Sequence, residues 1–377
     1  MKITILALHL GVGGVEKAIA TLANMLSSIH EVEIISVYKL SDKPSFDINK
    51  KIKIKYLIED LAPNKKEFKN AVKRLNILKV FKEGIKSLKI MSLKKERMIK
   101  SIKEINSDIV ISTRMYLNDL LGKYGGDYKK VAWEHFHPNE DMKHINGVVS
   151  SCKNMDYLVT VSEDLKKLYE DKVDIKCLKM PLSLDYMPSV KTSFDDMNII
   201  SVGRLSKEKG FSDLIDVMSL VKEKNDKIHL HIIGDGDERE RLKEKIKYLN
   251  LVNHVTLHGF KDRKEVDIFL SKSSLYIMPS FNESFGLTVL EALSVGVPVV
   301  AFDTAKGPLE ILNEKNSVII KNRDKEKMAL LIVKLISDKE KLKNMSRYAI
   351  ERAECFDYDT VQKEWLTFLG GITNDKG

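Results

Sequence analysis

Two glutamates in the second half of the sequence lie eight positions apart, at the ends of the run Glu283-Ser-Phe-Gly-Leu-Thr-Val-Leu-Glu291. Gly286 favours a turn, and the residues after it have the pattern of a helix. The start of a helix offers free N–H groups to an anion, here those of Gly286, Leu287 and Thr288. Carboxylates accept hydrogen bonds from hydroxyl groups. The run therefore predicts a site for a sugar diphosphate, and the alternative is a helix cap with a surface glutamate at each end.

A second group of candidates follows a predicted strand at residues 198–202. The loop Gly203-Arg-Leu-Ser-Lys-Glu-Lys-Gly210 carries Arg204 and Lys209. Cations at the carboxyl end of a parallel strand face the crevice where ligands bind, and they can neutralise the charge on a leaving diphosphate. A divalent metal does this in other enzymes, but no metal-binding motif adjoins these residues in the sequence. The alternative is that both side chains are solvated loop charges.

A glycine-rich loop, Gly11-Val-Gly-Gly-Val-Glu16, joins the first predicted strand to the first predicted helix. Gly13 and Gly14 let backbone N–H groups approach a phosphate, so the loop is a phosphate-binding candidate. It departs from the dinucleotide-binding pattern because Glu16 stands at the third glycine position. A tight turn without a ligand is the alternative.

Three further loops carry candidate residues. His135 and His137 lie in Trp-Glu-His-Phe-His-Pro after a short apolar run, where a general base or a sugar ligand could sit, although loop histidines are often structural. His135 is the better candidate because it is closer to the strand. The loops at Gly234 and at Phe260 each follow a predicted strand and can line a nucleoside pocket, or be ordinary turns.

The elements that position these residues are predicted by length and pattern. A chain of 377 residues with 43% hydrophobic and 31% charged residues suits two folded domains of similar size. The three cysteines are far apart, which speaks against a disulfide framework or a zinc site and favours a reducing compartment. The apolar start is too short to span a membrane and has no cleavage site of a signal peptide, so we expect a buried first strand.

Alternating strand and helix patterns run through both halves of the chain. They predict an α/β protein of two doubly wound, Rossmann-like domains, joined by a linker near residues 178–196. The predicted domains are residues 1–185, residues 186–357, and a return helix with tail at residues 358–377. The final helix is expected to end at Gly370 and Gly371.

Residues 61–103 concentrate the positive charge of the chain. They hold fourteen Lys or Arg and three Glu, a net charge of about +11, whereas the whole chain has +9. Such a segment attracts anionic lipid, nucleic acid or a polyanionic acceptor through the same field, so charge by itself does not choose among them. A solvated helical face is the alternative.

Taken together, GGVE near the start, SVGRLSKEKG, GDGDER and ESFGLTVLE resemble glycosyltransferase family 4, which has the GT-B fold of two Rossmann-like domains. The resemblance runs from end to end, and its C-terminal motifs are the specific part. It implies a retaining transfer without a metal, a cofactor or a covalent intermediate, across a cleft between the domains, with the last helix returning to the N-terminal domain.

The resemblance also implies roles for the candidate residues. Glu283 would bind the donor sugar, Glu291 the ribose, and Arg204 with Lys209 the diphosphate. His135 would be the active-site histidine, with His137 as the fallback. The predicted catalytic residues are His135 and Glu283, and the predicted donor-binding residues are Gly13, Gly14, Arg204, Lys209, Gly234, Phe260, Phe285, Gly286, Leu287, Thr288 and Glu291.

The expected function is transfer of a hexose or N-acetylhexosamine from a nucleotide sugar, in particular a uridine diphosphate sugar, to a lipid-linked or polymeric glycan in cell-surface polysaccharide synthesis. An epimerase of nucleotide sugars and a catalytically silent partner of another transferase are the alternatives. We expect a cytoplasmic protein that binds no nucleic acid, with residues 61–103 binding the anionic inner face of the cell membrane.

Overall fold

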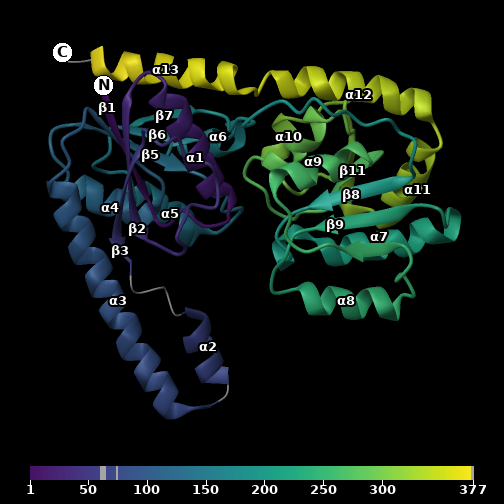
Figure 1. Cartoon of the computed structure of the whole chain (residues 1–377), viewed down its shortest axis with the longest axis horizontal. Coiled ribbons are helices and arrows are strands. Elements are labelled where there is room, and N and C mark those ends of the chain that lie inside the picture. Colours follow the sequence, from purple (N-terminus) through teal and green to yellow (C-terminus); the bar gives the residue numbers. More distant parts are fainter. Residues whose placement is uncertain (60–64, 74, 375–377) are drawn as a thin grey trace. The chain divides into compact units, whose positions relative to one another are not determined.

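The computed structural model describes residues 1–59, 65–73 and 75–374, which divide into two compact units. Unit 1 comprises Met1–Val161, Lys166–Met180 and Gln362–Gly377, and unit 2 comprises Ser162–Leu165 and Pro181–Val361. Each unit has its own parallel sheet with helices packed against it (Figure 1). The prediction of two doubly wound α/β domains is therefore confirmed.

Unit 1 has a sheet of seven parallel strands in the order β3-β2-β1-β4-β5-β6-β7. Strand order reverses between β1 and β4, so the carboxyl ends of these two strands border a crevice. The strands are β1 (Lys2–Ala7), β2 (Glu31–Tyr38), β3 (Lys53–Ile58), β4 (Ile109–Ser112), β5 (Lys129–Glu134), β6 (Tyr157–Thr160) and β7 (Lys176–Lys179). The connecting helices are α1 (Gly14–Ser27), α2 (Lys65–Lys73), α3 (Ile77–Lys103), α4 (Met115–Tyr124), α5 (Met142–Ser151) and α6 (Glu163–Tyr169), of which α6 belongs to unit 1 only from Lys166.

Unit 2 has six parallel strands in the order β10-β9-β8-β11-β12-β13, and its order reverses between β8 and β11. A core cluster of this unit is built mainly from Ile, Leu, Val and Met side chains. The strands are β8 (Asn198–Val202), β9 (His229–Ile233), β10 (Val255–Leu257), β11 (Leu275–Met278), β12 (Val299–Phe302) and β13 (Ser317–Ile320). The helices are α7 (Phe211–Lys224), α8 (Arg239–Tyr248), α9 (Arg263–Ser271), α10 (Leu287–Ser294), α11 (Lys325–Ile336) and α12 (Lys339–Glu354), with short 3-10 turns η1 (Lys207–Lys209), η2 (Gly307–Glu310) and η3 (Lys321–Arg323).

The predicted end of the last helix was wrong. Helix α13 (Tyr358–Asn374) continues through Gly370 and Gly371. Leu369 and Ile372 are buried on either side of the two glycines, and from Gln362 the helix belongs to unit 1. A glycine inside a helix costs about 1 kcal/mol, which burial of two aliphatic side chains outweighs. Strand β7 was also missed, because Lys-Cys-Leu-Lys is short and half polar.

Helices α2 and α3 extend away from the sheet of unit 1 (Figure 1). The two helices pack on each other. In the second part of α3 the side chains of Ile90 and Met98 are buried. The first part of α3 leaves large apolar side chains exposed, among them Leu78 and Phe81.

Candidate active site

The predicted cations and Glu283 lie at the topological switch point of unit 2. The loop after β8 carries Arg204 and Lys209, and the segment after β11 carries Glu283. Lys209 Nζ forms an ion pair with the Glu283 carboxylate, and both side chains are about one-quarter exposed. Arg204 is exposed. The fold therefore brings together residues that are 74 positions apart in the sequence.

A close approach of two backbone segments holds this ion pair in position. Gly210, which ends η1, has φ 68°, in the left-handed region that favours glycine. A Cβ atom at this position would collide with the carbonyl group of Pro279. Glycine thus allows the loop after β8 to pack against the segment after β11, and Phe281 N–H donates to the Glu208 carbonyl 2.8 Å away.

Helix α10 begins where the sequence predicted it. Gly286 precedes it with φ 97°, and a Cβ atom there would lie 2.8 Å from Pro308 Cγ. The N-terminal amides of Leu287 and Thr288 belong to the first turn, where backbone N–H groups have no partner within the helix. The Tyr276 hydroxyl is 2.8 Å from Thr288 Oγ1 and 3.1 Å from the Val202 carbonyl, which ties this turn to the end of β8.

Two predicted donor residues have side chains with packing partners inside unit 2. Phe285 is 2% exposed and its ring packs edge-on against Phe356 at 5.8 Å, so its side chain belongs to the core. Glu291 is 6% exposed, and its Oε1 forms an ion pair with Arg263 Nη1 at 2.6 Å. Arg263 was not predicted from the sequence, and no local motif marks it.

The three loops at the carboxyl ends of β8, β9 and β10 are hydrogen-bonded to one another. Gly203 N–H donates to the Ile233 carbonyl, and Leu205 N–H donates to the Asp235 carbonyl. Gly234 pairs with Gly259 through a 2.8 Å hydrogen bond. Phe260 follows this bridge and is 60% exposed, so its ring is available to a nucleoside. The loops at Gly234 and Phe260 thus form one surface with the loop of Lys209.

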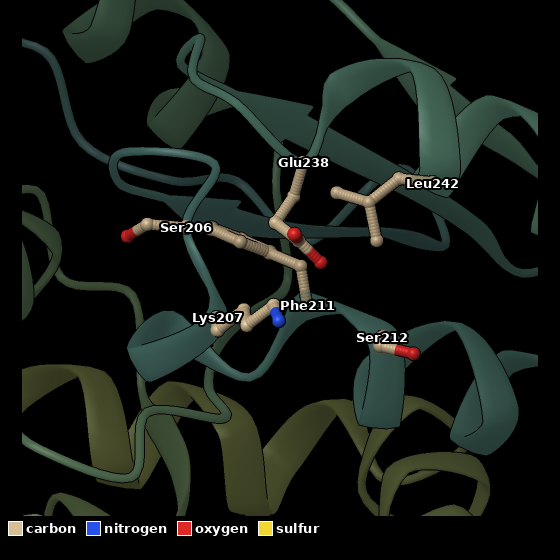
Figure 2. A pocket seen from close by; sticks show the side chains of 6 residues that line it. All are labelled: Ser206, Lys207, Phe211, Ser212, Glu238 and Leu242. Atoms are coloured by element: carbon tan, nitrogen blue, oxygen red, sulfur yellow. The ribbon is translucent and has the colours of Figure 1, made fainter. Parts of the chain in front are cut away.

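A small pocket lies beside this surface, and Figure 2 shows the side chains that line it. They come from the loop after β8, the start of α7 and helix α8, and they are Ser206, Lys207, Phe211, Ser212, Glu238 and Leu242. Neither Glu283 nor Glu291 lines it, but two of its residues belong to the loop of Arg204 and Lys209.

The glycine loop of unit 1 is filled by a side chain of the protein. The Glu16 carboxylate folds back against Gly13, where a Cβ atom would collide with it. Glu16 is 4% exposed, with Oε1 at 2.9 Å from Arg114 Nη2 and 3.6 Å from His9 Nδ1. Arg114 follows β4, so this cluster lies at the switch point of unit 1. A larger residue at Gly13 would displace the Glu16 carboxylate from this position.

His135 is buried against Trp133, with ring centroids 4.1 Å apart, and neither of its ring nitrogens has a hydrogen-bond partner among the described residues. Burial, with a smaller contribution from Arg114, lowers the pKa of His135 to about 3, so the ring is neutral. His137 differs, because its Nδ1 accepts the Asn139 N–H at 3.0 Å within a turn. The neighbouring Glu134 is also buried, and burial raises its pKa to about 7.

In the part of the chain that the structure describes, no group of three or more His, Cys, Asp or Glu side chains has a geometry suited to a metal ion. The Asp-x-Asp pattern at Asp235 and Asp237 belongs to the loop after β9, where Asp235 Oδ1 accepts the Gly236 N–H at 2.8 Å. Among the described residues, no helix is long and apolar enough to cross a membrane.

Two doubly wound units, one of them with cations, carboxylates and a helix N-terminus at its switch point, define a class of α/β proteins that bind nucleotide-linked ligands. Residues 188–352 match the family described as glycosyl transferases group 1. Residues 188–352 thus form a group 1 glycosyltransferase domain, and the chain is a glycosyltransferase. Helix α10 and the loops after β8 to β11 all lie in the matched range.

Similar proteins agree with the family. An uncharacterized glycosyltransferase of Haemophilus influenzae is 27% identical over 98% of this chain and 99% of its own length. An exopolysaccharide phosphotransferase of Streptomyces coelicolor is 25% identical over 97% of this chain, which spans 40% of that protein. A structure of an S. aureus TarM mutant with fondaparinux, α-GlcNAc-glycerol and UDP is 15% identical, covers 97% of this chain and 99% of its own, and has a TM-score of 0.78. The likeness confirms the GT-B fold.

Proposed function

We propose that this glycosyltransferase moves a hexose or N-acetylhexosamine from a uridine diphosphate sugar to a lipid-linked or polymeric glycan, with retention of anomeric configuration. The observation that carries the proposal is the meeting of Lys209, Glu283 and the N-terminus of α10 at the switch point of unit 2. A sugar diphosphate requires a cation and backbone amides for its phosphates and a carboxylate that accepts hydrogen bonds from its sugar hydroxyls.

Each group has a role in the proposal. The amides of Gly286, Leu287 and Thr288 hold a phosphate, and Arg204 with Lys209 neutralises the charge that develops on the leaving diphosphate. Glu283 binds hydroxyls of the donor sugar while its ion pair with Lys209 keeps it in place. Glu291 accepts hydrogen bonds from the ribose, and the loops of Gly234 and Phe260 receive the base.

His135 and the glycine loop are the candidate residues of unit 1 in this proposal. A neutral His135 has one ring nitrogen that donates and one that accepts, which suits sugar hydroxyls, and both are without a partner among the described residues. Gly13 and Gly14 lie at the switch point of this unit, next to Glu16. The acceptor hydroxyl attacks the face from which the diphosphate leaves, and no covalent intermediate forms.

Two of the relatives support the finer parts of the proposal. The TarM structure holds UDP together with an α-linked GlcNAc, a pair expected of a retaining transferase. The name of the Streptomyces protein refers to an exopolysaccharide, which supports a polymeric acceptor. The Haemophilus and Streptomyces proteins are named as transferases, and neither is named as an epimerase.

The test is release of UDP from a panel of UDP sugars incubated with glycan acceptors. We expect Glu283→Gln and Arg204→Met to lower kcat/KM by about a hundredfold or more, since each removes a charge from the transition state. Glu244→Gln on α8 is the control and should retain full activity. Turnover of donor without acceptor into an epimeric sugar would overturn transfer in favour of epimerisation. Tight UDP-sugar binding without turnover, restored by a partner transferase, would favour the silent partner.

We also propose that α3 lies on an anionic membrane at the cytoplasmic face. Its first part carries one exposed apolar stripe, because Leu78, Phe81, Ile85 and Leu88 are spaced by three or four residues and each is more than half exposed. An exposed lysine follows each of these residues, and the four are Lys79, Lys82, Lys86 and Lys89. An apolar face bordered by lysines fits the interface of a bilayer that contains anionic lipids.

Sedimentation with vesicles tests the membrane proposal. We expect binding to phosphatidylglycerol vesicles at low salt, and only partial release at high salt because the apolar stripe is not screened. The double variant Phe81→Ser, Leu88→Ser should lose the vesicle binding that remains at high salt. Leu330→Ser, at a residue of α11 that is 55% exposed, is the control. Equal affinity for neutral and anionic vesicles, or none for either, would overturn the proposal.

A further inference from the structure

Arg263, the first residue of α9, is engaged by groups of unit 2 through all three of its guanidinium nitrogens. Nη1 pairs with Glu291 Oε1 at 2.6 Å, and Nε pairs with Asp267 Oδ1 at 2.8 Å. Nη2 is 3.5 Å from Ser294 Oγ. The side chains of Arg263, Asp267 and Glu291 are 16%, 10% and 8% exposed, so the two ion pairs are shielded from solvent.

A second layer fixes the guanidinium in turn. The Tyr186 hydroxyl donates to Asp267 Oδ2 at 2.5 Å, and Arg263 lies over the Tyr186 ring at 5.4 Å. Burial, together with the hydrogen bond to Asp267, raises the pKa of Tyr186 to about 12, so the hydroxyl keeps its proton and remains a donor. One oxygen of Asp267 thus holds Arg263 and the other holds Tyr186.

This arrangement determines where Glu291 points. Glu291 and Ser294 both belong to α10, so Arg263 joins the start of α9 to the helix whose N-terminus faces the candidate diphosphate site. A glutamate has three side-chain torsions, and an isolated one would have to be ordered when a ligand binds. A buried ion pair with one oxygen orders it beforehand, which preorganises the carboxylate for hydroxyl groups.

We propose that Arg263 is the positioning residue that sets Glu291 for the diol of the nucleotide ribose, and that it thereby determines selection of ribose over deoxyribose. The inference rests on the proposed function, in which Glu291 binds the ribose. Arg263 does not contact the nucleotide. Asp267 and Tyr186 support it, so their loss has the same effect at smaller magnitude.

Affinities of the full-length protein for UDP and 2′-deoxy-UDP, measured by calorimetry, test this inference. A hydrogen bond between a hydroxyl and a charged group predicts that the wild type binds UDP about tenfold or more tightly than 2′-deoxy-UDP. In Arg263→Met the two affinities should differ by no more than about twofold, because the affinity for UDP falls and the affinity for 2′-deoxy-UDP does not. Arg263→Lys should fall between the two, and Tyr186→Phe should lower the ratio less than Arg263→Met.

The matched control is Arg241→Met, on the exposed side of α8, which should keep the wild-type ratio. If Arg263 only supported the fold, Arg263→Met would weaken both nucleotides equally and leave the ratio unchanged, which overturns the inference. Glu291→Gln separates this failure from a failure of the proposed function. If Glu291→Gln also leaves the ratio of the two affinities unchanged, Glu291 does not bind the ribose. If Glu291→Gln brings the ratio close to one while Arg263→Met does not, Glu291 binds the ribose and only the role of Arg263 is wrong.

Discussion

At the scale of single residues, the structure gives most candidate side chains a partner that the sequence did not reveal. Glu283 pairs with Lys209, Glu291 with Arg263, and Glu16 with Arg114. In each pair a carboxylate is matched by a cation from a different segment of the chain. Charges of opposite sign held in a partly buried site keep their orientation, which a binding site for a polar ligand requires.

Glu134 is predicted to make stability depend on pH. Burial raises its folded-state pKa from 4.5 to about 7, so the protonated form is favoured in the fold. This contribution is fully present below pH 4.5 and is lost as the pH rises to about 7. Glu134→Gln keeps an oxygen to accept the Phe136 N–H, and should stabilise the protein at pH 8 by at most about 3 kcal/mol, with little effect at pH 4.5.

Thermal unfolding at the two pH values checks this expectation. The exposed Glu140→Gln serves as the control and should leave the melting temperature unchanged at both. A melting temperature of Glu134→Gln that follows the wild type across the whole pH range would contradict a carboxyl group that titrates near neutrality.

Gly210→Ala is predicted to damage both stability and donor binding. Alanine is strained at φ 68°, and its Cβ atom would displace the Pro279 carbonyl. We expect a loss of about 1 to 3 kcal/mol in the free energy of unfolding and a higher KM for the UDP sugar. Denaturant unfolding and initial rates measure the two effects, and an unchanged KM would show that the loop of Lys209 does not depend on this contact.

At the scale of elements, helices are held by long-range packing even where their local propensity is poor. Helix α13 continues through Gly370 and Gly371 because its side chains Trp365 and Leu369 are buried in unit 1. Trp365 packs edge-on against Trp133, with ring centroids 5.2 Å apart. Tertiary contacts override a local stop signal in this helix.

The same glycines give a prediction of increased stability. A Cβ atom at Gly370 or Gly371 would meet no atom within 4 Å, and both positions are helical. Alanine at both positions should raise the free energy of unfolding by about 0.5 to 1 kcal/mol each, because alanine loses less backbone entropy. Chemical denaturation of the double variant measures this gain. A loss of stability would indicate that the helix ends before the glycines.

At the scale of the whole molecule, two units with separate cores should respond separately to a mutation and to a ligand. Trp365→Ala creates a cavity in unit 1, so we expect the free energy of unfolding of unit 1 to fall by about 3 to 5 kcal/mol. UDP should stabilise the backbone amides of unit 2 around Gly286. Hydrogen exchange resolved by region separates the two effects, with Trp365→Phe as the milder control. Equal loss of protection in both units on Trp365→Ala would contradict independent cores.

Removal of divalent metal is a second test at this scale. Arg204 and Lys209 provide positive charge at the proposed diphosphate site, so we expect transfer to continue at an unchanged rate in excess EDTA. Loss of activity that returns on addition of Mg²⁺ or Mn²⁺ would require a metal in the donor site.

The sequence by itself determined the order of strands and helices and the residue types at the strand ends. These features are local, since a strand pattern, a glycine turn and a helix start are each written within a few residues, as at Gly286. Two parallel sheets with their switch points follow from that order, and so does the placement of Glu283 and Lys209 in loops at the same switch point. Strand β7 and the end of α13 escaped prediction because packing, and not local pattern, decides them.

Only the tertiary structure decided which side chains meet. Arg263 and Glu291 are 28 positions apart, and Glu16 and Arg114 are 98 positions apart. No periodicity or spacing joins them, because their contact depends on which strands are neighbours and on how far each loop reaches. The physical reason is that a buried carboxylate requires a partner, while any of several cations in the sequence could provide it. The sequence thus determined the chemistry available at each switch point, and the fold determined the pairs that position it.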